Sequence, residues 1–136
     1  MKDLIAPIDR DILKAELNAD RFLRKTRKGE NEIYRVNCQN APQVLQEIGR
    51  LRELTFRASG GGTGEKVDLD EHDFGPYAYE QLIVWSPEDQ EIIGGYRYLV
   101  CAEALDQEGH YHLSTTHYFE FSAAFKEKYL PSTIEL

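Results

Sequence analysis

The sequence is poor in cysteine and has no long apolar run. Cys38 and Cys101 form no Cys-x-x-Cys pair and cannot build a disulfide framework, so we expect two free thiols, buried or half-buried. No segment approaches the roughly 20 apolar residues of a membrane-spanning helix. The opening residues, Met1 to Leu4, also lack the apolar stretch of a signal peptide. These absences predict a cytoplasmic protein.

Charge is divided unevenly along the chain. The net charge is −8, yet residues 1–60 carry an excess of basic side chains, and residues 61–136 carry a larger excess of acidic ones. The basic residues are densest between positions 21 and 28. This stretch is either a solvated edge or a landing patch for an acidic partner, such as a carrier protein or an anionic lipid surface, which leaves peripheral membrane contact open. Nucleic acid is not expected, because the acidic remainder would repel phosphate.

Apolar spacing predicts two helices and a hairpin in the first 58 residues. A helix is expected at 8–18, and the arms of a hairpin at 21–26 and 32–37. The sequence Asn40-Ala41-Pro42 is a helix-start signal, with Asn40 as the capping side chain. The second helix is expected to end near Ala58, where a glycine-rich run begins.

Residues 59–78 are expected to form a long loop that is first glycine-rich and then acidic. Its start does not fit a phosphate-binding loop, because Glu65 separates Gly64 from Lys66, and we interpret it as a hinge or lid. The acidic side chains that follow do not have the spacing of an EF-hand. They are interpreted either as a solvated turn or as a site for a cation or an amine.

The second half of the chain begins with two strong strands. They are expected at 81–85 and 91–100, and the glycines at 94 and 95 indicate a bulge or a close approach by another group. A short helix is expected at 121–130, and an apolar strand begins at 132. The whole chain, residues 1–136, is predicted to be a single domain.

Arg97 stands between two tyrosines in an apolar strand. A buried guanidinium needs a carboxylate partner, so we expect Arg97 to bind Asp70 or Asp73 and to organise a site. The alternating His110 and His112 are interpreted as structural, because no set of further ligands is evident nearby. No metal site is therefore expected.

Together these motifs resemble the GNAT-like N-acyltransferases of the ornithine- and glycine-lipid type, which include proteins described as hemolysin-type. Acyl-homoserine-lactone synthases are more distant relatives of this group. The resemblance covers residues 33–136. It rests on an Arg and a Phe four apart in the second helix, on the acidic run after the loop, on a "G-x-x-R" strand and on the start of an "E-x-x-R" strand. In this sequence those elements are Arg52 with Phe56, Asp68 to Asp73, Gly94 to Arg97, and Thr133 to Leu136.

The resemblance implies a fold and a reaction. The fold is α+β with layers of the α/β type: a mixed, mainly antiparallel sheet flanked by helices on both faces, with two helices after the first strand, incomplete in this chain. The reaction is N-acyl transfer in lipid biosynthesis, in which an amino-acid amine attacks the thioester of a fatty acyl-carrier protein or of CoA. No tightly bound cofactor is implied.

The resemblance also implies roles for individual residues. Glu135 is the expected proton acceptor near the amine, and Arg97 is expected to face a substrate carboxylate. Asp70 and Asp73 are expected either to hold the ammonium group or to brace Arg97. Arg52 and Phe56, the remaining substrate-binding residues, are expected to support the loop that covers the amine.

The sequence also departs from the family pattern. The arginine expected three residues after Glu135 would lie beyond Leu136, as would the acyl-donor groove. We therefore expect this chain to be the amine-side half, inactive alone, and to form a homodimer that covers an exposed sheet edge. The alternatives are a non-catalytic binding module and, third, an acyl-homoserine-lactone synthase, although Trp85 is not where those synthases carry their tryptophan.

Overall fold

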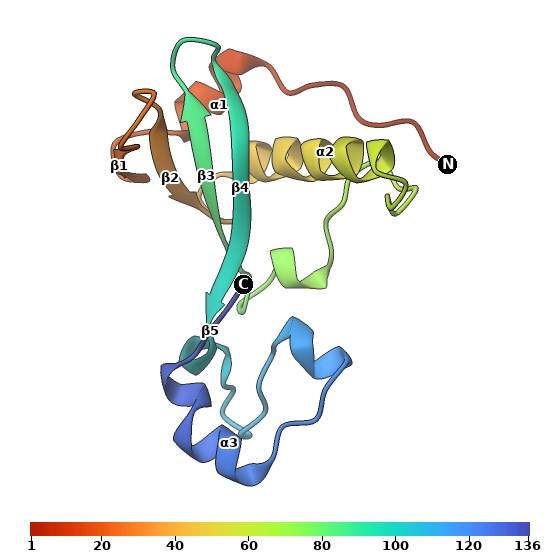
Figure 1. Ribbon diagram of the computed structural model, residues 1–136, viewed down its shortest axis with the longest axis vertical. Helices are drawn as coiled ribbons and strands as arrows, with labels where there is room; N and C mark the ends of the chain where they lie inside the picture. The colour runs from red at the N-terminus through yellow and green to blue at the C-terminus, as the bar shows by residue number, and fades with distance from the viewer.

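One antiparallel sheet organises the structure. In the computed structural model, which describes residues 1–136, five strands follow the order β1-β2-β3-β4-β5, and each neighbouring pair is antiparallel (Figure 1). The strands are β1 (Phe22–Lys25), β2 (Glu32–Val36), β3 (Glu80–Ser86), β4 (Glu91–Val100) and β5 (Ile134–Glu135). β5 pairs only with the end of β4, so most of the outer edge of β4 stays open.

Two helices pack on the same face of this sheet. They are α1 (Arg10–Glu16) and α2 (Pro42–Ala58). Because side chains alternate along a strand, Tyr34 on β2 and Ile83 on β3, which are cross-strand partners, point to this face together. They join Leu13 from α1 and Val44 and Ile48 from α2 in the larger of two cores. Burial of each of these apolar side chains stabilises the fold by about 1.5 to 3 kcal/mol.

The first turn of α2 is held by a residue from another helix. We expected Asn40 to cap it, but the cap position is Ala41, and no side chain there bonds to the helix. The Asn40 carboxamide instead accepts a hydrogen bond from the backbone N–H of Asn37. The Glu16 carboxylate at the end of α1 accepts the backbone N–H of Val44 at 2.7 Å. A negative charge is favoured there, because the helix dipole is positive at this end.

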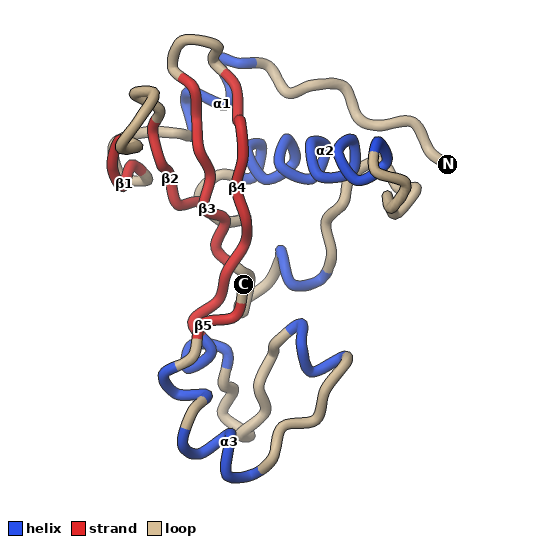
Figure 2. The backbone as a smooth tube through the Cα atoms, viewed as in Figure 1, coloured by secondary structure: helices blue, strands red, loops and turns tan.

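The rest of the chain forms a smaller lobe beyond the lower end of β4 (Figure 2). It contains η2 (Cys101–Ala104), η3 (Ser114–His117), α3 (Ala123–Lys128) and η4 (Leu130–Ser132), packed around a second buried core. The helix expected at 121–130 is shorter than predicted. Ser122 caps its start by accepting the N–H of Phe125, and the chain turns into η4 at Leu130.

The predicted fold class is confirmed: the structure is α+β, with an antiparallel sheet flanked by helices. Two details differ from expectation. α1 and α2 share one face of the sheet because both contribute to the same core, and only one α-helix, followed by the short η1 (Glu71–Asp73), connects β2 to β3. Both cysteines are free, Cys101 buried and Cys38 partly so. None of the helices is both long enough and apolar enough to cross a bilayer.

Candidate functional site

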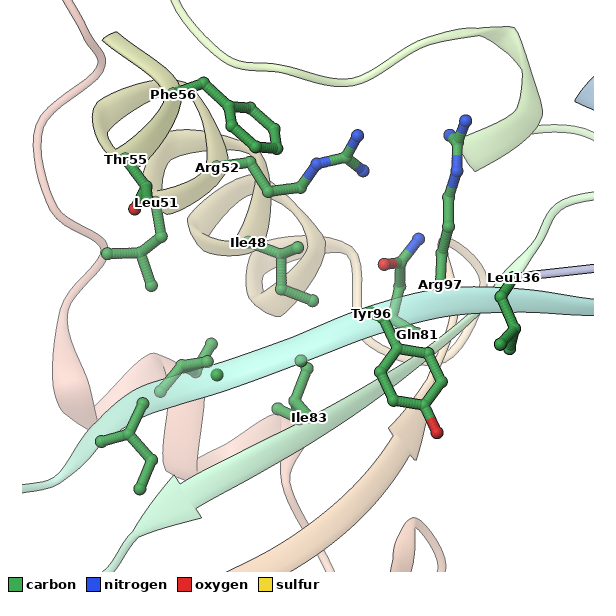
Figure 3. A pocket seen from close by; sticks show the side chains of 14 residues that line it. Ile48, Leu51, Arg52, Thr55, Phe56, Gln81, Ile83, Tyr96, Arg97 and Leu136 are labelled. Atoms are coloured by element: carbon green, nitrogen blue, oxygen red, sulfur yellow. The ribbon is translucent and has the colours of Figure 1, made fainter. Parts of the chain in front are cut away.

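A pocket of about 540 Å³ lies between α2 and β4 (Figure 3). One wall is a stripe of α2 whose residues recur every three or four positions, and the other is β4 with part of β3. Most of the lining is apolar, which is typical of small-molecule sites. The stripe consists of Ile48, Leu51, Arg52, Thr55 and Phe56.

The predicted irregularity in β4 shapes the floor of this pocket. Trp85 pairs with Ile92 and Val84 with Gly94, so Ile93 is an extra residue and forms a bulge. At Gly95 a Cβ atom would lie 2.5 Å from the carbonyl oxygen of Leu82, so only glycine fits the close approach of the two strands. Both indications of the paired glycines, a bulge and a close approach, are therefore confirmed.

Arg97 forms the ion pairs that the sequence predicts, and it forms them with both aspartates. Its Nη1 donates to Asp70 Oδ1 at 2.8 Å and to Asp73 Oδ2 at 3.0 Å, and its Nη2 donates to Asp70 Oδ2 at 3.0 Å. The Asp73 side chain is 0% exposed, whereas that of Asp70 is 47% exposed. The second Asp73 oxygen accepts from Gln81 Nε2 at 2.8 Å, so both oxygens of this buried carboxylate have hydrogen-bond donors.

The pKa values at this cluster follow from its charges. Burial of the Arg97 guanidinium by itself lowers its pKa, but the hydrogen bonds and charges of Asp70 and Asp73 outweigh burial and raise that pKa above its ordinary value. Burial likewise raises the pKa of Asp70, but its hydrogen bonds with Arg97 dominate and hold that pKa below the usual range. Asp70 and Asp73 therefore brace a permanently charged Arg97 in this structure.

Arg52 and Phe56, which lie one turn apart on α2, both line the pocket. Arg52 Nε donates to Asp68 Oδ2 at 3.2 Å, while its Nη1 and Nη2 make no hydrogen bond within the protein. Figure 3 shows the guanidinium groups of Arg52 and Arg97 on the same side of the pocket. The site thus combines an apolar cavity with one free guanidinium fork.

Glu135 lies outside this pocket, although its neighbour Leu136 lines it. Its carboxylate accepts a hydrogen bond from the hydroxyl of Tyr79 and another from Thr115 Oγ1 at 2.6 Å. The Arg97 guanidinium lies 5.1 Å from the centre of the Tyr79 ring. Burial and the nearby Glu135 carboxylate raise the pKa of Tyr79, so its hydroxyl stays protonated.

Tyr79 therefore connects Glu135 to Arg97, a role that no pattern in the sequence predicts. The residue sits just before β3, among loop residues without periodic spacing, so no pattern marked it as buried. Its hydroxyl also accepts the backbone N–H of Ser114 at 2.8 Å, which ties η3 to the same network.

Glu53 is a second residue that sequence reasoning missed. It is fully buried in α2 and accepts four hydrogen bonds: one from Arg57, two from Thr63 and one from Gly64. The glycine-rich loop, interpreted from the sequence as a hinge or lid, is held here by this carboxylate. The available signal was an acidic residue one turn before Arg57, beside glycines whose N–H groups need acceptors.

The comparisons with known proteins agree with the predicted resemblance. Residues 51–136 match the family described as acetyltransferase (GNAT) domain. A glycine N(alpha)-acyltransferase of Bacteroides thetaiotaomicron is 54% identical over all of this chain, and one of Phocaeicola vulgatus is 53% identical over the same span. The chain spans 41% and 42% of the lengths of these two curated relatives. No solved structure matches.

Proposed function

We propose that this chain, which belongs to the GNAT acetyltransferase domain family, supplies the amine side of an N-acyltransferase. The substrate we propose is glycine or a similarly small amino acid, because both curated relatives carry the name glycine N(alpha)-acyltransferase. In the reaction, the amine attacks the carbonyl carbon of an acyl thioester. An amide bond forms and the carbon–sulfur bond breaks. The sulfur leaves as a thiolate, which takes up the proton that the amine loses and becomes the free thiol.

The free fork of Arg52 is the observation that carries the proposal. Its Nε is fixed by Asp68, so the two Nη nitrogens are held in place at the pocket without a protein partner. A planar fork of this kind matches a carboxylate, which accepts two parallel hydrogen bonds. We therefore place the amino-acid carboxylate at Arg52, with Phe56 beside it and the amine directed into the pocket.

The apolar remainder of the pocket suits a hydrocarbon chain. Ile48, Leu51 and Ile83 line it, so burial of a fatty acyl group against these side chains would be favourable. The product would be an N-acyl amino acid, which supports a place in lipid biosynthesis. The acyl donor is proposed to be a thioester of acyl-carrier protein or of CoA. The basic stretch at 21–28 lies around β1, at the opposite edge of the sheet from β4, so it does not favour carrier docking beside the pocket.

Arg97 and Glu135 are proposed to act in catalysis in different ways. Arg97 lines the pocket, and its fixed positive charge would favour negative charge that develops on the thioester oxygen. The Glu135 carboxylate is bonded to Tyr79 and Thr115, so it is better suited to position the Tyr79 ring against Arg97 than to accept a proton directly. A direct base would need a free oxygen facing the amine.

The test is an assay of the protein at its natural length with labelled glycine and either palmitoyl-CoA or palmitoyl-acyl-carrier protein. Arg52→Ala removes the proposed carboxylate contact, worth about 2 to 3 kcal/mol, and is expected to raise the KM for glycine by about 30- to 150-fold. The KM for the donor should stay unchanged. The matched control is Arg35→Ala, on an exposed side chain of β2 outside the pocket.

Two results would overturn the proposal. One is an Arg52→Ala variant whose KM for glycine equals that of Arg35→Ala. The other is the absence of thiol release from either donor with any small amino acid, combined with measurable glycine binding in calorimetry, which would favour the non-catalytic binding module. The two donors, tested side by side, decide between acyl-carrier protein and CoA.

A further inference from the structure

Three metal-ligating side chains meet beside a second cavity, away from the pocket already described. They are Glu71 and His72 on η1 and His117 at the end of η3, which is 45 residues further along the chain. His72 Nε2 lies 3.0 Å from His117 Nε2, and Glu71 Oε1 lies 3.2 Å from His117 Nε2 and 3.8 Å from His72 Nε2. The cavity beside them has a volume of about 440 Å³.

These three separations fit one metal ion. A point equidistant from the three atoms lies about 2.0 Å from each of them, and typical zinc distances are about 2.0 to 2.2 Å for imidazole nitrogen and carboxylate oxygen. An ion with slightly longer bonds would sit just above the plane of the three ligand atoms. Its remaining coordination positions would then face the adjoining cavity, where water has room to bind.

We propose that Glu71, His72 and His117 bind one divalent transition-metal ion, with zinc the best match. Two imidazoles and one carboxylate suit zinc and its neighbours in the first transition row, and they suit calcium or magnesium poorly because those ions take oxygen ligands. His72 is held in place, since its backbone N–H donates to Asp70 and its ring packs edge-on against Tyr79 at 5.5 Å.

The sequence prediction of no metal site is revised by this proposal. That prediction rests on His110 and His112, which are close in the sequence and have no further ligands evident nearby. In the structure His112 bonds to Asp106 at 2.8 Å, and His117 meets His72 instead. Only the fold brings the ligands of the two segments together.

The ion would fasten the two segments that support the first pocket. η1 is capped by Asp70 and ends at Asp73, the two partners of Arg97, whereas η3 begins with Ser114 and Thr115, which bond to Tyr79 and Glu135. A metal bridge between η1 and η3 therefore closes a ring of contacts behind the pocket. The three ligands do not line that pocket, so the ion would hold η1 and η3 together rather than contact a substrate bound there.

The experiment titrates Co²⁺, as a coloured probe for zinc, into the complete protein after treatment with a chelator and without a polyhistidine tag. We expect one Co²⁺ per chain, with visible absorption bands that Zn²⁺ abolishes by competition. His117→Gln and Glu71→Gln each remove one ligand and should weaken binding by about tenfold or more. Both side chains are exposed, so both variants should fold, as circular dichroism in chelator will verify.

The matched control is His110→Gln, an exposed histidine with Asp106 and Glu108 oxygens 3.8 Å away. It should bind Co²⁺ within about twofold of the parent, because loose surface contacts of this kind add little. Zn²⁺ should also raise the unfolding midpoint of the parent and not that of His117→Gln. Absence of a one-to-one complex, or equal weakening by His110→Gln and His117→Gln, overturns the proposal.

Discussion

Removing the Asp73 carboxylate should destabilise the protein far more than removing that of Asp70, although both bind Arg97. Asp73 is completely buried and accepts hydrogen bonds from Arg97, from Gln81 and from the backbone N–H of Asp70. The Asp70 side chain is nearly half exposed, so water can replace many of the hydrogen bonds that its carboxylate makes with Arg97. The comparison therefore separates the effect of burial from the effect of charge.

The magnitudes follow from what each substitution leaves behind. Loss of one partner from a buried ion pair costs about 3 to 5 kcal/mol. Asp73→Ala should fall at the lower end, about 3 kcal/mol, because Asp70 keeps two contacts with the guanidinium of Arg97. Asp70→Ala should cost about 1 kcal/mol. Asp73→Asn should also cost about 1 kcal/mol, because the Gln81 amide can turn over and offer its oxygen to the new NH₂ group.

Urea unfolding followed by circular dichroism measures these differences without added salt, which would screen the ion pairs. A double-mutant cycle with Arg97→Met completes the test. In that background Asp73→Ala should cost less than in the parent, since no buried cation is left unpaired. Equal losses for Asp73→Ala and Asp70→Ala would refute the reasoning, because they would mean that burial of the carboxylate does not set the cost.

Three further predictions concern stability alone. In urea unfolding, Gly95→Ala should lower the free energy of unfolding by about 2 kcal/mol, because its Cβ would collide with a backbone carbonyl. A Cβ at Gly94 would meet nothing within 4 Å, so Gly94→Ala should cost clearly less. The pKa of Glu53 is about 2, because four hydrogen bonds outweigh the effect of burial. The ionised Glu53 therefore stabilises the fold fully above its ordinary pKa of 4.5, and this stabilisation is lost as the pH falls toward 2. The unfolding free energy of Glu53→Gln should vary less over that pH range than that of the parent. Glu16→Ala should lower the unfolding free energy by about 1 kcal/mol through the lost cap of α2, and an unchanged value would show that Ala41 and water suffice.

Periodic patterns predicted the strands and the long helix well, because those elements depend on local spacing. The alternation of Glu32 to Val36 and the apolar run of β3 each place one face on a core, and a shift by one residue would expose it. The same reasoning could not place Glu16 at the start of α2. Glu16 accepts hydrogen bonds from the backbone of Gln43, 27 residues later, and of Val44, 28 residues later. Nothing in the local sequence favours Glu16 over Asn40 as the cap.

The candidate site was partly predictable for a related reason. Arg97 in an apolar strand demands a carboxylate, so its pairing with Asp70 and Asp73 followed from charge and burial alone. Tyr79 makes no such demand, because a tyrosine is common both inside and outside a fold, and its link to Glu135 appears only when β5 pairs with β4. Glu135 lies 56 residues further along the chain than Tyr79, so no local pattern connects the two.

Because Glu53 holds the glycine-rich loop at Thr63 and Gly64, the residues just before that anchor form a convenient attachment point for a reporter group. Gly61 has an ordinary backbone angle, a side chain there would meet nothing within 4 Å, and its N–H donates to the carbonyl oxygen of Phe56 at 2.8 Å. A fluorophore on Gly61→Cys would sit just beyond the end of α2, and Gly61 is hydrogen-bonded to Phe56, whose side chain lines the pocket. With Cys101 buried, only Cys38 would have to be replaced for selective labelling, and glycine binding would then be visible as a change in emission.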